Sequence, residues 1–552
     1  MTEERALLGL MMDFDLTVGV LLRRAEALFP KREVVTRTST GLHRYTYLDL
    51  GSRARKLAVS LKELGLKRGD RVATLCWNHH QHVEAYYGIP LAGGVLHTLN
   101  ARLHESDLAA IVTHAGDRYL IVDEQLLPVY ERFANEVSLE NVLVVADHPS
   151  DRDRLVDFET LLRNADENHY VELSPDEREA AAMCYTSGTT GGAKGVLYSH
   201  RSLVLHSLMS CLPGTLDIRE TDTVLVIPPL FHVNGWGFPY TCALVGANQV
   251  FPGAHPDPED LLNLLEQERV TITGCVPTVG LALLDRLDRN PDQYDLSALR
   301  SIIVAASAAP RAMIEGFQER HGLTVVHAWG MTELSPTGCV SRLRSELLEE
   351  SSEIQYDYRT KQGLPVPLVE IRARGEDSLV PWDGATTGEL EVRGPWVAGA
   401  YYGQSDAADR FTEDGWFRTG DIATIDPMGY VEIRDRAKDL IKSGGEWISS
   451  VALETALIGH PAVSEAAVIA VPHEKWGERP LAVVVLKEGA TATADELREI
   501  LEGRFAKWWL PDVFEFVDEI PKTSIGKYQK SVLRERYAEA FSKERVSSAG
   551  SR

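Results

Sequence analysis

Residues 181–195 read AAMCYTSGTTGGAKG, an apolar run followed by a loop rich in glycine and hydroxyl side chains. The run is typical of a buried strand, and glycines after a strand let backbone N–H groups turn inward as an anion nest. Lys194 adds a point charge. The stretch therefore predicts a loop that binds a polyphosphate through the residues Thr186, Ser187, Gly188, Thr189, Thr190 and Lys194.

A Walker P-loop is the nearest alternative, but the residues around Lys194 do not fit it. Ala193 stands where that motif has glycine, and Gly195 stands where it has the Mg²⁺-binding Ser or Thr. A solvated Gly/Ser/Thr turn is the remaining alternative. The number of polar side chains directly after a buried strand favours phosphate binding over such a turn.

Around this loop, short β-branched runs alternate with helical patterns, which predicts an α/β fold class with layered subdomains. From about Gly388 the pattern changes to hairpin-like strands, which predicts a β-rich subdomain. A self-contained α+β set of helices and strands follows, and we place the domain boundary between 437 and 438. The predicted strands are 71–76, 119–122, 142–145, 224–227, 272–275, 301–304, 389–393, 466–471 and 481–486, and the predicted helices begin near residues 199, 260, 451 and 495.

The chain has 552 residues, 44% of them hydrophobic, which is enough for several domains without disulfide or metal support. With 57 Lys+Arg against 81 Asp+Glu, the net charge of −24 argues against general binding to nucleic acid or to anionic lipid. Six scattered cysteines indicate reduced thiols. The N-terminal apolar stretch is too short for a membrane span, so we expect a cytoplasmic protein without an integral membrane segment.

Four further motifs follow the loop in a fixed order. They are WGMTE at 329–333, RTGD at 418–421, DRAKDLIKSGGE at 435–446 and PKTSIGK at 521–527. Together with the loop they resemble the adenylate-forming superfamily, and the chain looks most similar to bacterial medium- and long-chain fatty-acid–CoA ligases. The resemblance runs from about residue 20 to about residue 540.

The resemblance implies a large N-terminal domain (1–437) and a small, mobile C-terminal lid (438–552) that rotates about a hinge at Lys438. It implies ATP, Mg²⁺ and CoA as cofactor and co-substrates, and a reaction in two steps. A carboxylate first attacks the α-phosphorus of ATP to give acyl-AMP and pyrophosphate, and the CoA thiol then displaces AMP. Because related enzymes often form homodimers, a homodimer is also expected.

The resemblance also implies the roles of individual residues. Lys527 would bridge the substrate carboxylate and the α-phosphate, although a surface lysine in a turn is the ordinary alternative. Thr332 would contact the α-phosphate and Glu333 would hold Mg²⁺, with a helix-capping pair as the alternative. Asp421 would bind the ribose hydroxyls and Arg436 the ribose or a phosphate, with an ordinary Asp–Arg surface pair as the alternative.

Two positions of the nucleotide site need separate comment. Trp329 stands where the family usually has the tyrosine that stacks on adenine, so stacking is expected to persist while the phenol is lost. Gly444 and Gly445 resemble the segment that contacts CoA, although a Gly-Gly hairpin turn is equally natural.

The segments that line the acyl pocket in relatives carry no acidic residue here, which favours an apolar acid over an amino acid. Trp236 resembles the gate of fatty-acid tunnels, with ordinary core packing as the alternative. Gly330 replaces the bulky aromatic of acetate-activating relatives, and His232 would orient the carboxylate or cap a loop.

The sequence predicts a medium- or long-chain fatty-acid–CoA ligase and leaves two other classes open. One keeps the adenylate but changes the acid or the acceptor, such as a ligase for methylthiopropionate or an aryl acid, or a luciferase-like oxidase. The other is a nucleotide-binding regulator without catalytic activity, which the joint presence of Lys194, Glu333 and Lys527 argues against.

Overall fold

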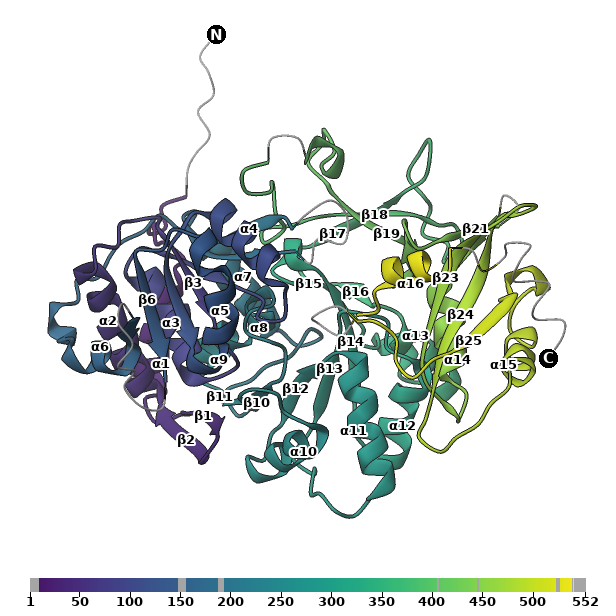
Figure 1. Cartoon of the computed structure of the whole chain (residues 1–552), viewed down its shortest axis with the longest axis horizontal. Coiled ribbons are helices and arrows are strands. Elements are labelled where there is room, and N and C mark those ends of the chain that lie inside the picture. Colours follow the sequence, from purple (N-terminus) through teal and green to yellow (C-terminus); the bar gives the residue numbers. More distant parts are fainter. Residues whose placement is uncertain are drawn as a thin grey trace, which may run out of the picture.

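The computed structural model describes residues 9–146, 155–186, 193–404, 407–443, 446–522, 527–538 and 540. Within these ranges the strands form four sheets. Figure 1 shows the purple and blue N-terminal residues on the left, the yellow C-terminal residues on the right, and helices α10 (Pro258–Gln267), α11 (Pro277–Arg289) and α12 (Arg311–His321) below the centre. The α/β fold class is therefore confirmed.

Two largely parallel sheets form the body of the protein, and helices pack against them as the alternating sequence pattern predicts. The seven-stranded sheet has the order β7 (Leu155–Asp157), β6 (Asn141–Val145), β5 (Asp117–Asp123), β3 (Arg71–Leu75), β4 (Val95–Thr98), β8 (Ala180–Tyr185), β9 (Gly195–Ser199). The nine-stranded sheet has the order β16 (Leu364–Pro365), β15 (Thr337–Val340), β14 (Val325–Gly330), β13 (Ser301–Val304), β12 (Ile272–Cys275), β10 (Thr223–Val226), β11 (Asn248–Phe251), β1 (Glu33–Thr38), β2 (Gly41–Thr46).

Two smaller sheets follow. An antiparallel sheet contains β17 (Glu370–Arg374), β18 (Gly388–Arg393), β19 (Phe417–Ile425) and β20 (Val431–Arg436). The last sheet contains β22 (Glu446–Ile448), β21 (Ile441–Ser443), β24 (Gly477–Leu486), β23 (Val463–His473) and β25 (Val513–Phe516), and we call it, with its helices α14–α16, the C-terminal lobe. The predicted β-rich section and α+β section are both present.

Several helices begin directly after a residue whose side chain caps them, such as α2, α7 and α10. Ser199 accepts a hydrogen bond from the N–H of Ser202 and starts α7, as predicted. The helix expected to begin near residue 495 starts at Ala494 and ends at Glu502, where Gly503 forms its C-cap. The helices are α1 (Val18–Leu28), α2 (Tyr47–Glu63), α3 (His80–Leu91), α4 (Glu105–Ala115), α5 (Leu127–Phe133), α6 (Phe158–Asn164), α7 (His200–Ser210), α8 (Val233–Trp236), α9 (Phe238–Val245), α10 (Pro258–Gln267), α11 (Pro277–Arg289), α12 (Arg311–His321), α13 (Ser352–Thr360), α14 (Ser450–Ile458), α15 (Ala494–Glu502) and α16 (Lys530–Arg536).

The C-terminal lobe is held against the end of β20. The Asp435 carboxylate accepts hydrogen bonds from both the backbone N–H and the hydroxyl of Ser450, each at 2.6 Å, at the first residue of α14. Lys530 at the start of α16 donates to the same hydroxyl at 2.7 Å and pairs with Glu454 at 2.7 Å. These polar contacts hold the lobe so that Lys527, three residues before α16, faces the body.

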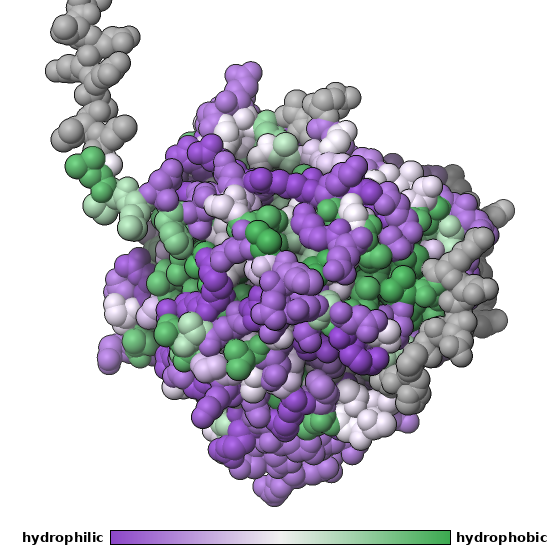
Figure 2. Space-filling model, turned by 90° about the vertical axis from the view of Figure 1, so that its left-hand side faces the viewer, coloured by the Kyte–Doolittle hydropathy of each residue, from purple (hydrophilic) through white to green (hydrophobic). Residues whose placement is uncertain are grey.

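The surface is mainly polar, as expected for a chain in which 25% of residues are charged. Figure 2 shows hydrophilic residues over most of one face, with apolar side chains gathered in smaller patches between them. Among the described residues, no helix combines the length and the apolar character needed to cross a bilayer. All six cysteines are free thiols, as predicted.

Candidate active site

A cavity of about 390 Å³ lies between the body and the C-terminal lobe, and we call it the inter-lobe cavity. A second cavity of about 230 Å³ adjoins it, sharing Trp329, Gly330 and Arg436, and includes Asp421 in its lining. The predicted site residues that line the inter-lobe cavity are Thr186, Lys194, His232, Trp236, Trp329, Gly330, Thr332, Glu333, Arg436, Lys438 and Lys527. Ser187, Gly188, Thr189, Thr190, Gly444 and Gly445 lie outside the described residues.

Several residues of the cavity lining lie at or just after the carboxyl ends of parallel strands. In such sheets these ends meet at one edge, which is where ligands bind in open α/β folds. Ala305 follows β13, Thr332 and Glu333 follow β14, and His232 lies in the segment after β10. Residues far apart in sequence therefore reach one cavity.

The phosphate loop is closed at its base by two hydrogen bonds. The Thr186 N–H donates to the Lys194 carbonyl at 2.9 Å, and the Lys194 N–H donates to the Thr186 hydroxyl at 3.1 Å. These bonds continue the antiparallel pairing of β8 and β9. The two hydrogen bonds position Lys194 in the cavity wall, where its Nζ lies 4.8 Å from the centre of the Tyr401 ring.

Thr332 and Glu333 begin a short 3₁₀ turn after β14 and are both buried. The Tyr198 hydroxyl donates to the Thr332 carbonyl at 2.7 Å, and the Ala398 N–H donates to the Glu333 carbonyl at 2.7 Å. The Tyr401 hydroxyl donates to Glu333 Oε1. The carboxylate is thus held in a fixed orientation at the wall of the cavity, which is a requirement for a preorganised ligand.

Asp421 links the predicted adenine and ribose contacts. Its Oδ2 accepts a hydrogen bond from the indole N–H of Trp329 at 2.9 Å, and its Oδ1 pairs with Arg436 Nε at 2.6 Å. The side chain of Asp421 is 2% exposed. The exchange of tyrosine for tryptophan therefore replaces a phenol by an indole donor that is already engaged with Asp421.

Lys527 is partly buried, and several charged side chains surround it. Desolvation and the nearby cations Arg436 and Lys438 together lower the pKa of its ammonium to about 8, against the opposite effect of Asp421 and Glu333. Because its charged form is destabilised in this way, the Lys527 ammonium is stabilised when an anionic ligand binds beside it. The structure thus places Lys527 together with the residues of the body, as the sequence predicts.

One part of the inter-lobe cavity is apolar, and we call it the acyl part because the sequence predicts that it holds the acyl chain. Its lining includes Leu216, Val233, Ile303 and Met331, which belong to the main hydrophobic core or pack against it. Burial lowers the pKa of His232 to about 3, so its imidazole is neutral at pH 7.

Trp236 stands on an unusual turn. Val233, Asn234, Gly235, Trp236 and Gly237 all have positive φ, from 47° to 75°. Non-glycine residues seldom adopt this conformation, and it concentrates at functional sites because the surrounding structure must enforce it. The turn carries Trp236 into the cavity lining.

Sequence reasoning did not identify Leu216, Arg410 or Tyr401, all of which line the cavity. Tyr401 lies 68 residues from Glu333, and no motif spacing connects the two. Its contact arises only when the segment after β18 folds back over β14.

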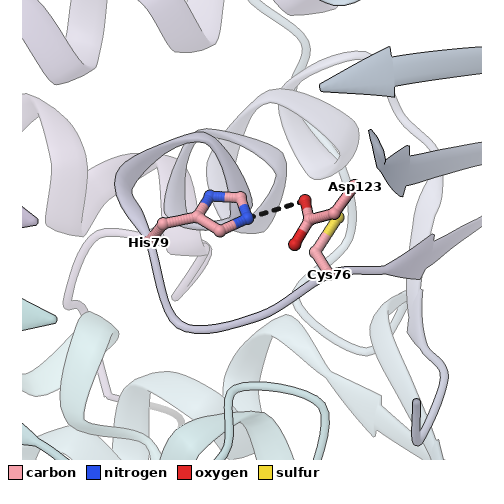
Figure 3. A group of neighbouring side chains, drawn as sticks. All are labelled: Cys76, His79 and Asp123. Atoms are coloured by element: carbon pink, nitrogen blue, oxygen red, sulfur yellow. Dashed lines mark hydrogen bonds and ion pairs between the residues drawn. The ribbon is translucent and has the colours of Figure 1, made fainter. Parts of the chain in front are cut away.

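A second cluster lies outside this cavity. Ligand atoms of Cys76, His79 and Asp123 lie within 4.8 Å of one another (Figure 3). His79 Nδ1 accepts from the His82 N–H at 3.3 Å, so Nε2 carries the proton that faces Asp123 Oδ1 at 2.7 Å. Metal binding through Nε2 would need this proton to leave. The hydrogen bonds therefore indicate a cap at the start of α3 rather than a metal centre.

Comparison with known proteins agrees with this geometry. The pattern of the AMP-binding enzyme family matches residues 22–402, and that of the AMP-binding enzyme C-terminal domain matches residues 452–527. The chain belongs to the AMP-binding enzyme family. The predicted superfamily is therefore confirmed.

Relatives of this family member are similar over nearly its whole length. A long-chain-fatty-acid–CoA ligase of Thermus thermophilus is 49% identical, over 96% of each chain. A medium-chain-fatty-acid–CoA ligase of Ectopseudomonas oleovorans is 41% identical, over 97% of this chain and 98% of its own. The anthranilate CoA ligase AuaEII, solved with anthranoyl-AMP, has a TM-score of 0.86 at 26% identity, over 96% of this chain and 99% of its own. This family member is thus an AMP-forming acid–CoA ligase that uses ATP and CoA.

Replacing Gly330 by alanine should destabilise the protein. A Cβ at Gly330 would lie 2.0 Å from the carbonyl oxygen of Pro336, so the backbone must shift, which costs about 1–3 kcal/mol. Gly503→Ala is the matched control, because a Cβ there meets nothing within 4 Å. Urea unfolding should show a lower midpoint for Gly330→Ala than for Gly503→Ala, and equal midpoints would contradict this packing.

Proposed function

We propose that the protein activates a medium- or long-chain fatty acid as acyl-AMP and transfers it to CoA, in the cytoplasm, with Mg²⁺ as cofactor. One observation carries the proposal: a single cavity combines an apolar part of its lining with the charged side chains of Lys194, Lys527 and Glu333. The relatives named as long- and medium-chain ligases support the choice of acid. The homodimer stays a prediction of the sequence.

The lining of the acyl part supports an acid with an apolar tail. The described residues that form it are Leu216, His232, Val233, Trp236, Ile303, Ala305, Ala306, Ala328, Met331, Pro336 and Thr337, none of which carries a carboxylate. A substrate ammonium would be buried there without an anionic partner, at a large cost in free energy. A hydrocarbon chain instead gains from burial against these side chains. We propose Trp236 as the gate at this pocket, with neutral His232 orienting the carboxyl group and Gly330 lying beside the chain.

In the first step two anions must approach each other. We propose that the Lys527 ammonium lies between the fatty carboxylate and the α-phosphate, and that Thr332 contacts the α-phosphate. The carboxylate oxygen then forms a bond to phosphorus, and the bond to pyrophosphate breaks. Lys194 and the hydroxyls of the loop, Thr186 among them, would hold the leaving pyrophosphate.

The residues around Glu333 fit a Mg²⁺ site. A hard divalent cation prefers carboxylate and phosphate oxygens, and Glu333 is a buried carboxylate beside the proposed phosphate positions. When bound, the cation would neutralise phosphate charge. Glu333 would hold it, and Lys194 would share the charge of the triphosphate.

The nucleoside would lie against Trp329, Asp421 and Arg436. The indole offers a face for adenine, and each oxygen of Asp421 has a second lone pair that can accept a hydrogen bond from a ribose hydroxyl. Arg436 already orients this carboxylate at 2.6 Å. For the second step, we propose that the domain beginning at residue 438 rotates about Lys438 and brings Gly444 and Gly445 to the site for CoA.

The function is tested by an acid panel. Decanoate, palmitate, methylthiopropionate, benzoate and acetate are each supplied with ATP and Mg²⁺, with and without CoA. AMP and acyl-CoA should form fastest with the fatty acids. Release of ADP, or a clear preference for methylthiopropionate or benzoate, would overturn the proposal, and nucleotide binding without turnover would indicate a regulator.

Lys527→Ala should separate the two half-reactions. Formation of acyl-AMP should fall by about 100-fold or more, because a cation aimed at the developing charge is lost. Conversion of preformed acyl-AMP and CoA to acyl-CoA should change little. Single-turnover measurements of both steps check this, and an equal loss in both would refute the assigned role.

The pKa of Lys527 predicts a pH profile. Its folded pKa of about 8 means that the ammonium loses its proton as the pH rises through this value, so the kcat/KM of adenylation for ATP should fall above about pH 8. Lys527→Arg should be slower but lack this alkaline limb, since a guanidinium stays charged. A wild-type kcat/KM that stays constant up to pH 10 would contradict the assigned role of the Lys527 ammonium.

A further inference from the structure

One short segment joins the two halves of the proposed triphosphate site. The backbone N–H of Ala398 donates to the carbonyl of Glu333 at 2.7 Å, and the N–H of Tyr402 donates to the carbonyl of Gly195 at 2.9 Å. Gly195 follows Lys194 directly. Residues 398–402 are therefore anchored at one end to the acidic turn and at the other end to the phosphate loop.

Tyr401 lies within this segment, and its side chain touches the charged groups on both sides. Its hydroxyl donates to Glu333 Oε1, and its ring centre lies 4.8 Å from Lys194 Nζ. Tyr401 is 5% exposed and lines the inter-lobe cavity. Tyr401 thus contacts both charged groups. Its ring face attracts the Lys194 ammonium, and its hydroxyl fixes the Glu333 carboxylate.

This arrangement fits a site in which the Lys194 ammonium and the Glu333 carboxylate, two opposite charges, must both face the bound nucleotide. A direct ion pair between Lys194 and Glu333 would satisfy each charge with the other. Tyr401 instead orients the carboxylate with a neutral donor and supports the ammonium with a neutral ring. Each group is positioned while its charge stays available to phosphate or to a cation.

We infer that Tyr401 is a positioning residue that sets the orientation of Glu333 and Lys194, and with it the affinity for Mg²⁺–ATP. The inference rests on the proposed role of Glu333. Hydrogen-bond partners of metal ligands commonly change metal affinity by 10–100-fold when they are removed. The hydroxyl and the ring of Tyr401 can be removed separately, so the two contacts can be tested one at a time.

Tyr401→Phe removes the hydroxyl and keeps the ring. Binding of an ATP analogue with a non-hydrolysable α,β bridge is measured by calorimetry in the full-length protein, with and without Mg²⁺. We expect the gain in affinity on adding Mg²⁺ to shrink by about 10-fold, while the affinity without Mg²⁺ stays near that of the wild type. Tyr401→Leu also removes the ring, so the affinity without Mg²⁺ should fall as well, by roughly 3-fold or more.

Tyr402→Phe is the matched control, because it makes the same change one residue away at a side chain outside the cavity lining. It should bind the analogue as the wild type does. An unchanged Mg²⁺ effect in Tyr401→Phe, or equal losses in Tyr401→Phe and Tyr402→Phe, would overturn the inference. Since the assay contains no acid or CoA, its result is independent of which acid the enzyme uses. Should Tyr401→Leu not fold, the comparison of the two phenylalanine variants decides.

Discussion

The structure depends on the convergence of charges in a buried cavity. A carboxylate and a triphosphate repel each other, so a protein that joins them must offer cations from more than one direction. Lys194 comes from the seven-stranded sheet, Arg436 from the antiparallel sheet and Lys527 from the C-terminal lobe. Burial and mutual repulsion lower the pKa of Lys527 to about 8, which leaves the ammonium poised for an anionic ligand.

The fold gives each charged group a rigid support. The paired ends of β8 and β9 deliver Lys194, the turn after β14 presents Glu333, and Asp435 caps the helix that anchors the C-terminal lobe. The acyl side is supported differently, by a turn of residues with positive φ that brings Trp236 to the cavity. Strain of this kind is retained where surrounding packing enforces it, and here it lies beside the pocket proposed for the fatty chain.

Much of this could be predicted from the sequence, for two physical reasons. The alternation of β-branched runs with helical patterns is local information, and it predicted strands such as 272–275 and 301–304 with the bounds that the structure shows. Ordered motifs located most of the charged residues that line the cavity, with Arg410 as an exception. The contacts of Tyr401 and Leu216 could not be predicted in this way, because they depend on how distant segments pack. The packing reason for glycine at position 330 could not be predicted either, because the carbonyl of Pro336 approaches Gly330 only in the folded structure.

We expect Lys527 of the C-terminal lobe to act in the same cavity as the phosphate loop of the body. The decisive measurement is a crystal structure with Mg²⁺, a fatty acid and a non-hydrolysable ATP analogue. In this complex Lys527 Nζ should contact both the carboxylate and the α-phosphate, while Lys194 should contact the terminal phosphates. A complex with the nucleotide bound in the inter-lobe cavity and Lys527 facing solvent would contradict it.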